Sequence, residues 1–456
     1  MMKKKLEDPG KYIVGIGASA GGLEAIELFF SHMPADSGMA FVVIQHLSPD
    51  HKSLMVELLS KKTQMPVCRA EDGMLVEENT VYLIPPKKNL TIFHSKLLLQ
   101  EQDRFQGINL PIDLFLQSLA EDAEEKAIAI ILSGTGSDGM RGSRKIKEAG
   151  GMIMVQTEES AKFDGMPRAA ISTGLVDFIL SPEEMPAQLL SFIKHPHTSR
   201  EELSGNLLSD DDGLTRIFAV LRDKHKVDFT YYKPSTVVRR IGRRMTVNQL
   251  ESVKEYVNYL TLYPSEVTQL YREILIGVTS FFRDVEAFKL LEEHFLPRLL
   301  KSAKKGERRF WVAGCSTGEE AYSLAMLICE CMEKLGISGK VKIFATDIDN
   351  DAIVKAGAGV YPESIAADLN AQLISKYFYR KDNNLHISRT IREMVVFAKH
   401  NLVQDPPFTN IDFISCRNLL IYLQPNLQKR AMEMFNFALN PGSILFLGSS
   451  EATGEM

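Results

Sequence analysis

The sequence predicts an α/β protein in three successive parts, of which the first and third are α/β and the middle one is all-α. Three observations predict this order. Short β-branched runs alternate with amphipathic helical periods as far as Lys194, residues 214–300 are helical in pattern and poor in strand signals, and the alternation resumes at Arg309. Because such alternation requires crossover connections, we expect a doubly wound parallel sheet first, then a small all-α domain and a Rossmann-like fold.

The predicted elements follow from these patterns in chain order. In the first part we expect strands at residues 12–16, 40–45, 80–84, 127–132 and 152–155. Residues 195–213 lack a periodic apolar face, which predicts an exposed linker. In the third part we expect strands at residues 310–313, 341–346, 411–415 and 443–447, and helices over 319–334, 349–358 and 424–438. The domain boundaries that we predict are 10–195, a linker at 196–212, a helical domain at 213–285 and a last domain at 286–456.

The composition is that of an ordinary soluble globular protein. Of the 456 residues 45% are hydrophobic and 24% are charged, which excludes collagen-like and disordered chains. The net charge of −5 argues against nucleic-acid binding by the molecule as a whole. The five cysteines lack paired CxxC spacing, which argues against a disulfide framework or structural metal site and favours a reducing, cytoplasmic compartment. No apolar run approaches the ~18 residues of a membrane span, so membrane insertion is not expected.

A glycine-rich turn follows the first predicted strand. Residues 15–22 read GIGASAGG and lead into a helix. One interpretation is a dinucleotide-binding turn, in which N–H groups at the helix N-terminus bind a pyrophosphate. That interpretation requires an acidic residue at the end of the second strand to bind the ribose. The second strand ends instead at His46, so the ribose ligand is missing.

A serine hydrolase accounts for both the turn and the histidine. The hydroxyl of Ser19 can act as a nucleophile while the N–H groups that follow it stabilise an oxyanion. His46 is the candidate general base, and Asp138, after the strand at residues 127–132, is the candidate group that orients the imidazole. Each alone could be a turn, cap or strand-end residue, but three at one sheet edge predict a catalytic triad. Other polar residues nearby have loop positions that favour turn or cap roles: Asp50, His51 and Asp164.

Four motifs of this region together resemble the catalytic domain of the chemotaxis receptor methylesterase CheB, over about residues 12–194. They are IGASAGG at residues 16–22, IQH at 44–46, LSGTGSDG at 132–139 and GMP at 165–167. The resemblance implies that Ser19, His46 and Asp138 hydrolyse glutamate methyl esters on receptor helices, and it raises deamidation of receptor glutamines as a second activity. Two features depart from the family. Thr135 stands where Met is common, and no receiver domain precedes the first strand, so we expect control without an attached receiver.

A second glycine-rich turn follows the strand at residues 310–313. Residues 314–318, GCSTG, fit the nucleophile elbow G-x-S-x-G, and the absence of a following Lys disfavours a P-loop. The next strand ends at Asp347, a carboxylate in the place where Rossmann-type sites bind ribose hydroxyls, which favours a nucleoside cofactor over a second serine hydrolase. The glycine turn is followed by Glu319 and Glu320 instead of basic residues, which does not suit the phosphates of a dinucleotide. A cationic ligand without phosphate, such as S-adenosyl-L-methionine, fits this charge.

The later motifs resemble the receptor methyltransferase CheR over about residues 214–456. They are TSFFR at 279–283, STGEE at 316–320, TDID at 346–349, HNL at 400–402, CRN at 416–418 and IY at 421–422. CheR continues with a further strand pair, so we expect a longer natural protein. Gly277 stands where the family often has an Asn that contacts the cofactor, and it is left out of the set. By resemblance, the residues that contact S-adenosylmethionine are Thr279, Arg283, Glu320, Asp347, Asn401, Leu402, Cys416 and Arg417.

A basic cluster marks the helical part. Its members Arg239, Arg240, Arg243 and Arg244 fall within one short helical stretch. The structural interpretation is a solvated basic face, and the functional one is a docking surface for the acidic helices of a receptor. Nucleic-acid binding is the third choice, because stacking aromatic residues are absent from the stretch.

These observations predict a bifunctional enzyme that adds methyl groups to receptor glutamates and removes them. The expected partners are the cytoplasmic helices of methyl-accepting receptors and other signalling proteins, without nucleic acid. Because the two activities oppose each other, we expect partner binding or domain arrangement to favour one site at a time. The alternatives are a signalling scaffold without turnover and an RNA methyltransferase fused to a hydrolase.

Overall fold

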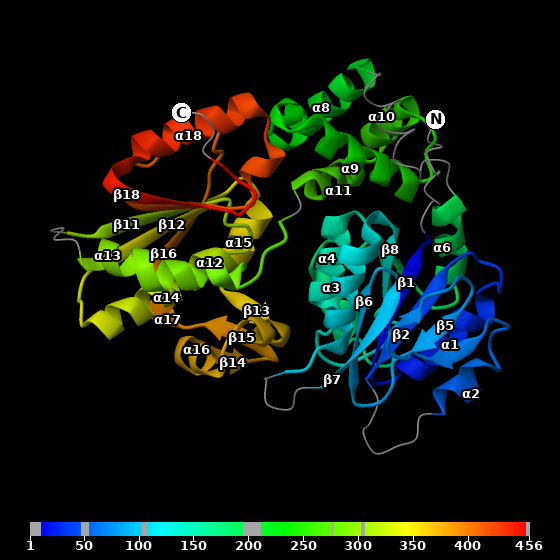
Figure 1. Ribbon diagram of the computed structural model, residues 1–456. Helices are drawn as coiled ribbons and strands as arrows, with labels where there is room; N and C mark the ends of the chain where they lie inside the picture. Colours follow the sequence, from blue (N-terminus) through cyan, green and yellow to red (C-terminus); the bar gives the residue numbers. More distant parts are fainter. Residues whose placement is uncertain are drawn as a thin grey trace, which may run out of the picture. The chain divides into compact units, whose positions relative to one another are not determined.

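The computed structural model describes residues 11–46, 54–102, 108–194, 211–275, 277–301 and 306–452 (Figure 1). Most of the predicted linker, together with Asp50 and His51, lies outside the described residues. The chain forms two compact units, Met1–Ile217 with Val238–Ile276, and Phe218–Val237 with Gly277–Met456. No helix in the described ranges is long and apolar enough to cross a membrane.

The first unit is built on a seven-stranded sheet in which every neighbouring pair is parallel, in the order β10-β9-β8-β1-β2-β5-β3. Its strands are β1 (Ile13–Ala18), β2 (Ala40–Gln45), β3 (Val67–Arg69), β5 (Val81–Leu83), β8 (Ala127–Ile131), β9 (Met152–Gln156) and β10 (Phe178–Leu180). One face packs against α1 (Gly22–His32), α2 (Met55–Leu59) and α6 (Met185–Lys194). The other packs against α3 (Pro111–Ala123), α4 (Met140–Ala149) and α5 (Gly165–Ser172). The parallel sheet with both faces covered is therefore confirmed.

Strand β1 is glycine-rich because α3 packs directly on it. Ile16 faces the α1 side of the sheet, whereas Ile13 faces the α3 side. A Cβ atom at Gly17 would lie 2.5 Å from a side-chain carbon of Ile112 on α3, so this strand position has no room for a larger residue. The close approach brings the N-terminus of α3 to the edge of the sheet where β1 ends.

A small antiparallel sheet, formed by strands that lie on both sides of β5 in the sequence, was not predicted. It has the order β4-β7-β6, with β4 (Met74–Leu75), β6 (Lys88–Phe93) and β7 (Lys96–Glu101). A single turn of helix, η1 (Glu124–Lys126), precedes β8. The helical segment contains α8 (Asp211–His225), η3 (Phe229–Tyr231), α9 (Pro234–Val247), α10 (Val253–Leu262) and α11 (Pro264–Leu275). It is helical as predicted, and Pro234 and Pro264 each begin a helix.

The second unit contains a five-stranded parallel sheet in the order β16-β12-β11-β17-β18. Its strands are β11 (Arg308–Ala313), β12 (Val341–Asp347), β16 (Val395–Lys399), β17 (Ile411–Cys416) and β18 (Leu439–Leu447). One face packs against α12 (Val285–Leu290), η4 (Leu291–Phe295), α13 (Leu296–Lys301) and α14 (Glu319–Leu335), and the other against α18 (Pro425–Ala438). The edge strand β16 was not predicted, and β18 begins at Leu439, before the expected start at residue 443.

The remaining elements of the second unit surround this sheet. A separate three-stranded antiparallel sheet, β13-β15-β14, was not predicted either. The remaining elements of the unit, in chain order, are α15 (Asn350–Ala358), β13 (Val360–Pro362), η5 (Glu363–Asp368), α16 (Ala371–Tyr377), β14 (Phe378–Lys381), β15 (Asn384–Ile387), α17 (Arg389–Met394) and η6 (Leu420–Tyr422). Residues around η3 join this unit, because the Gln424 N–H donates to the Tyr231 carbonyl at 3.0 Å and the Lys233 N–H to the Tyr422 carbonyl at 2.9 Å.

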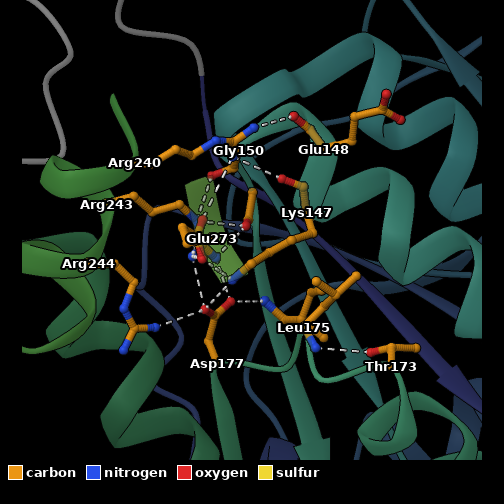
Figure 2. Close-up of polar contacts among 12 residues, drawn as sticks. Lys147, Glu148, Gly150, Thr173, Leu175, Asp177, Arg240, Arg243, Arg244 and Glu273 are labelled. Atoms are coloured by element: carbon orange, nitrogen blue, oxygen red, sulfur yellow. Dashed lines mark hydrogen bonds and ion pairs between the residues drawn. The ribbon is translucent and has the colours of Figure 1, made fainter. Parts of the chain in front are cut away.

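The basic cluster of α9 is buried inside the first unit (Figure 2). Arg240, Arg243 and Arg244 are only 3%, 8% and 7% exposed. Arg243 pairs with Asp177, which follows α5, and with Glu273 on α11 at 3.1 Å. Both expectations for this cluster, a solvated face and a docking surface for receptor helices, are therefore wrong for these three residues. Their charges are paired within the first unit, where acidic partners offset the free-energy cost of burying a guanidinium group.

The same arginines hold the C-terminal end of α4. Arg240 donates to the carbonyls of Lys147 at 3.2 Å and Glu148 at 3.1 Å, and Arg243 donates to the carbonyls of Gly150 and Gly151. The last carbonyls of a helix have no partner within the helix, so guanidinium groups from α9 supply the missing donors. Figure 2 shows these contacts together with the ion pairs.

The acidic partners of these arginines are held in their ionised forms. Burial by itself would raise the pKa of Asp177, but the adjacent Arg243 and Lys147 outweigh it and hold the pKa below its usual range. The pKa of Glu273 is lowered in the same way, with burial opposed by Arg243 and Lys147. Because both pKa values are depressed in the folded state, the stability that these carboxylates contribute is present above the unfolded pKa, near 4, and is lost as pH falls through the folded values.

Replacing Arg243 by Met is expected to destabilise the first unit strongly. Asp177 and Glu273 would lose their central partner, and breaking a buried ion pair on one side costs about 3–5 kcal/mol. The measurement is calorimetry of the full chain together with hydrogen exchange of peptides from α4 and α11. Arg239→Met is the matched control, because Arg239 lies on the same helix and forms no ion pair among the described residues. Equal effects of the two substitutions would contradict the assignment.

Candidate active sites

Three neighbouring strands of the first unit end at the same edge of the sheet. Strand β1 lies between β2 and β8, and all three are parallel. Ser19 follows β1, His46 follows β2 and Asp138 lies in the loop between β8 and α4. The pairing of Ala18 with Gln45 puts the first two residues at the same level. The topology therefore brings three chemically distinct side chains to one place.

The three side chains form a chain of hydrogen bonds. Ser19 Oγ lies 3.3 Å from His46 Nδ1, and His46 Nε2 lies 2.8 Å from Asp138 Oδ2. The carboxylate bonds to Nε2, so the proton of the neutral imidazole belongs on Nε2 and the lone pair of Nδ1 faces the hydroxyl. This geometry allows Nδ1 to accept the serine proton. The side chain of His46 is 34% exposed, whereas that of Asp138 is 2% exposed.

Helix α3 binds the carboxylate of Asp138 at its N-terminus. Asp138 Oδ2 accepts the Ile112 N–H at 3.1 Å, and Oδ1 accepts the N–H groups of Asp113 at 2.8 Å and Gly139 at 2.9 Å. The N-terminus of a helix has unpaired N–H groups and a positive dipole end, both of which favour a negative charge. The main-chain bonds to both oxygens therefore fix the orientation of the carboxylate, and Oδ2 also bonds His46.

The turn around Ser19 is shaped by main-chain bonds. The Ser19 N–H donates to the Ser133 carbonyl at 3.0 Å, and the Gly22 N–H donates back to the Ser19 carbonyl at 2.9 Å. Within the described ranges, the N–H groups of Ala20 and Gly21 have no acceptor. Two adjacent free N–H groups beside a nucleophile are what an oxyanion site requires.

The second site lies at the carboxyl ends of β11, β12, β16 and β17. Gly314 and Ser316 follow β11 with φ values of 79° and 46°, which turn the chain sharply before α14 begins. Asp347 ends β12 and pairs in register with Lys399, directly before the segment that carries Asn401. In open α/β sheets, ligands bind at this end of the strands. The second candidate site is thus the edge of the sheet at which its central strands end.

The carboxylate of Asp347 organises the turn after β11. Its Oδ2 accepts the Ser316 N–H at 2.8 Å and its Oδ1 accepts the Asp349 N–H at 2.9 Å. Burial raises the pKa of Asp347, and the bonds from Asp349 and Ser316 partly offset this rise. Ser316 Oγ in turn donates to the Gly277 carbonyl at 3.1 Å, so the segment that begins at Gly277 lies next to this turn.

A second group of charged residues lies at the same end of the sheet. Glu320, in the first turn of α14, accepts the Ser415 hydroxyl at 2.6 Å and lies 3.5 Å from Arg417. Burial raises the pKa of Glu320, and Arg417 opposes the rise. Arg417 also donates to the Arg283 carbonyl at 3.0 Å and pairs with Asp284. These bonds tie the loop after α11 to the end of β17.

The other predicted contact residues lie near the same edge of the sheet. Thr279 is half-buried in the segment between Gly277 and Arg283. Asn401 and Leu402 follow β16, and the Asn401 side chain accepts the Val403 N–H at 3.0 Å. The structure therefore brings the eight residues to one edge of the sheet, although Cys416 is fully buried in the core, with its pKa raised by burial.

Comparison with known proteins matches both units. Residues 14–189 match the family described as CheB methylesterase. Residues 212–275 match the CheR methyltransferase all-alpha domain, and residues 277–456 match the CheR methyltransferase SAM binding domain. A chemotaxis protein methyltransferase of Borreliella burgdorferi is 30% identical over 263 residues, which are 56% of this chain and 93% of that protein.

The chain belongs to the CheB and CheR families. A 104.1 kDa protein of Rhodobacter capsulatus, described as uncharacterized, is 41% identical over 420 residues, which are 87% of this chain but only 44% of that protein. This chain thus spans less than half the length of that relative. The crystal structure of the Thermotoga maritima CheB methylesterase catalytic domain is 30% identical, with a TM-score of 0.37, and the match covers 40% of this chain and 98% of that one.

The residues at this edge of the CheR domain fit S-adenosylmethionine. The carboxylates of Asp347 and Glu320 line the region where strands end, and a sulfonium cation with ribose hydroxyls suits such acceptors. The buried Nε of Arg417 has no hydrogen-bond partner, so a donor remains for the carboxylate of an amino-acid ligand. No phosphate-binding Lys is required.

Sequence reasoning missed several groups that shape the two sites. In the CheB domain these include Ser133, whose hydroxyl donates to the Ala20 carbonyl at 2.9 Å, and Asp113 beside the triad. In the CheR domain they include Ser415 and Asp284. Ser133 and Ser415 lie at strand ends that the sequence placed correctly, so their position at the carboxyl end of a strand was the one available signal.

Proposed function

We propose that this chain is a bifunctional enzyme that methylates glutamate side chains of chemotaxis receptors with S-adenosylmethionine and hydrolyses the resulting methyl esters. Deamidation of receptor glutamines belongs to the same hydrolytic site. The observation that carries the proposal is the hydrogen-bonded series from Ser19 through His46 to Asp138 in a chain that also carries a CheR domain. The enzyme acts in the cytoplasm on the helices of methyl-accepting receptors and other signalling proteins.

Ester hydrolysis follows the serine-hydrolase sequence. His46 Nδ1 accepts the proton of Ser19 while Oγ attacks the ester carbonyl carbon, and the N–H groups of Ala20 and Gly21 stabilise the oxyanion. The imidazolium then gives its proton to the departing methoxide, which leaves as methanol. Water, deprotonated by the same imidazole, releases the glutamate from Ser19. Asp138 stabilises the imidazolium throughout.

Methyl transfer needs alignment more than acid or base catalysis. The bound cofactor supplies a methyl group on a cationic sulfur. A glutamate carboxylate is already ionised at neutral pH, so the protein must orient it and partly remove its water. Glu320 and Asp347 offer acceptors for the cation and the ribose, and Arg417 offers donors for a carboxylate. The proposed binding set is Thr279, Arg283, Glu320, Asp347, Asn401, Leu402, Cys416 and Arg417.

The test is incubation of the full chain with a methyl-labelled donor and receptor cytoplasmic fragments. We expect label on glutamate side chains, released by mild base as methanol, and release of methanol from pre-methylated fragments by the chain alone. Binding of both ligands without turnover would indicate a scaffold instead. Label in RNA, with binding that weakens steeply as salt rises, would indicate the RNA methyltransferase alternative.

A further inference from the structure

A second buried carboxyl group lies beside the proposed triad. Asp113 is the third residue of α3 and is 2% exposed. Its main-chain N–H donates to Asp138 Oδ1 at 2.8 Å, while its own side-chain Oδ1 accepts the Gly142 N–H of α4 at 2.7 Å. Asp113 therefore connects the start of α3, the triad carboxylate and the first turn of α4.

The contact between the two helices is close enough to fix their separation. A Cβ atom at Gly142 would lie 2.5 Å from Leu116 Cβ and 3.1 Å from Asp113 Cα, so only glycine allows α4 to approach this far. Asp138 and Gly139 directly precede α4. A shift of α4 relative to α3 would consequently move the carboxylate that orients His46.

The surroundings of Asp113 disfavour a negative charge on its side chain. Its Oδ2 is buried without a hydrogen-bond partner. The charged groups that act on it are Asp138, which repels a second negative charge, and Arg141 of α4, which opposes that repulsion. Of the strands that pack on α3, β1, β2 and β8 bring no charged residue, and Lys88 of β6 pairs with Glu101. The charged residues of η1 follow the opposite end of α3. Burial and Asp138 raise the pKa of Asp113 to about 8, against the lowering effect of the Gly142 N–H and Arg141.

We propose that Asp113 is a positioning residue of the esterase, which holds α4 and the triad carboxylate in register as an uncharged acid. The inference rests on the proposed hydrolytic function of the CheB domain. A neutral carboxyl can remain buried next to Asp138 and still accept the Gly142 N–H. An ionised one would place two negative charges at the same helix N-terminus and drive α3 and α4 apart.

This role has a pH signature that simple packing lacks. In the folded state Asp113 keeps its proton up to about pH 8, whereas in the unfolded chain it loses the proton near pH 4. Between these values the native state binds more protons than the unfolded one, so this group makes stability fall as pH rises. Above about pH 8 the side chain ionises in the folded state, and we expect hydrolysis to decline as the triad is disturbed.

The test compares the full chain with Asp113→Asn and Asp113→Ala. Asn keeps an oxygen for the Gly142 N–H and carries no charge at any pH, so it should retain most of the hydrolysis at pH 7 and lose the decline above about pH 8. Ala should lower kcat/KM by about 10- to 100-fold, because the triad carboxylate loses its support. Glu121→Gln is the matched control, since it removes an exposed carboxylate from the same helix.

Calorimetry supplies a readout that does not depend on turnover. From pH 5 to 8 the wild-type unfolding temperature of the first unit should fall relative to that of Asp113→Asn. Three results would each overturn the inference. One is an unfolding temperature that changes with pH in the same way in the wild type and in Asp113→Asn. The others are a pH profile of hydrolysis in Asp113→Asn that overlays that of the wild type, and an equal loss of hydrolysis in the Asn and Ala variants. Absence of hydrolysis by the wild type would instead refute the proposed function, and the stability comparison would still decide the charge state of Asp113.

Discussion

Replacing Ser19 by Ala is expected to lower kcat for ester hydrolysis by at least about 10³-fold, because the residual rate would come only from the oxyanion site and substrate binding. Fold and cofactor binding should be unchanged, since the Ser19 main-chain bonds do not involve its side chain. With labelled donor and receptor fragments, methyl esters should accumulate faster and reach a higher final level than with the wild-type chain. The measurement is methanol release from pre-methylated fragments, followed by mass spectrometry.

The control for this substitution is Ser31→Ala, which removes an exposed hydroxyl at the far end of α1. It should hydrolyse esters at the wild-type rate. If Ser19→Ala hydrolysed esters as fast as the control, Ser19 would not be the nucleophile. A loss of comparable size in His46→Ala but not in Ser19→Ala would point to a water nucleophile activated by the imidazole.

Replacing Asp347 by Asn should weaken S-adenosylmethionine binding by about 10- to 100-fold, because one charged acceptor in a buried site contributes roughly 1.5–3 kcal/mol. The side chain keeps one oxygen for a main-chain N–H, so the turn after β11 is retained better than in an Ala variant. Methyl label on receptor fragments should fall accordingly, while hydrolysis of pre-methylated fragments continues. Calorimetric titration with the cofactor measures the loss directly.

Asp351→Asn is the control for this site, because it removes an exposed carboxylate from the first turn of α15, four residues further along the chain. Its affinity for the cofactor should match that of the wild type. If the Asp347 variant bound the cofactor as tightly as the wild type, Asp347 would not belong to the proposed binding set. A parallel loss of ester hydrolysis would show that the substitution had damaged more than the cofactor site.

Together the two variants separate the opposing activities. The Ser19 variant should add methyl groups without removing them, and the Asp347 variant should remove them without adding more. Comparable uncontrolled turnover of both sites, on the isolated chain and on the receptor-bound chain, would contradict the expectation that one site is favoured at a time.

The sequence by itself determined the main sheets and the places where their chemistry lies. The strand at residues 40–45 was predicted with its observed bounds, and helix α14 was predicted to within one residue at its end. Buried parallel strands are continuous apolar runs, and the turns that follow them carry glycine, so both signals are local in the chain. Ser19, His46 and Asp138 could be selected because each follows such a run.

Only the tertiary structure decided what the remaining polar residues do. The arginines of α9 look like a surface in sequence, yet they are buried against Asp177 and Glu273, which lie far away in the chain. Asp113 resembles an ordinary acidic residue in the first turn of a helix until α4 covers it. The charge state and role of such groups depend on burial and on distant partners, which the periodicity of a sequence does not encode.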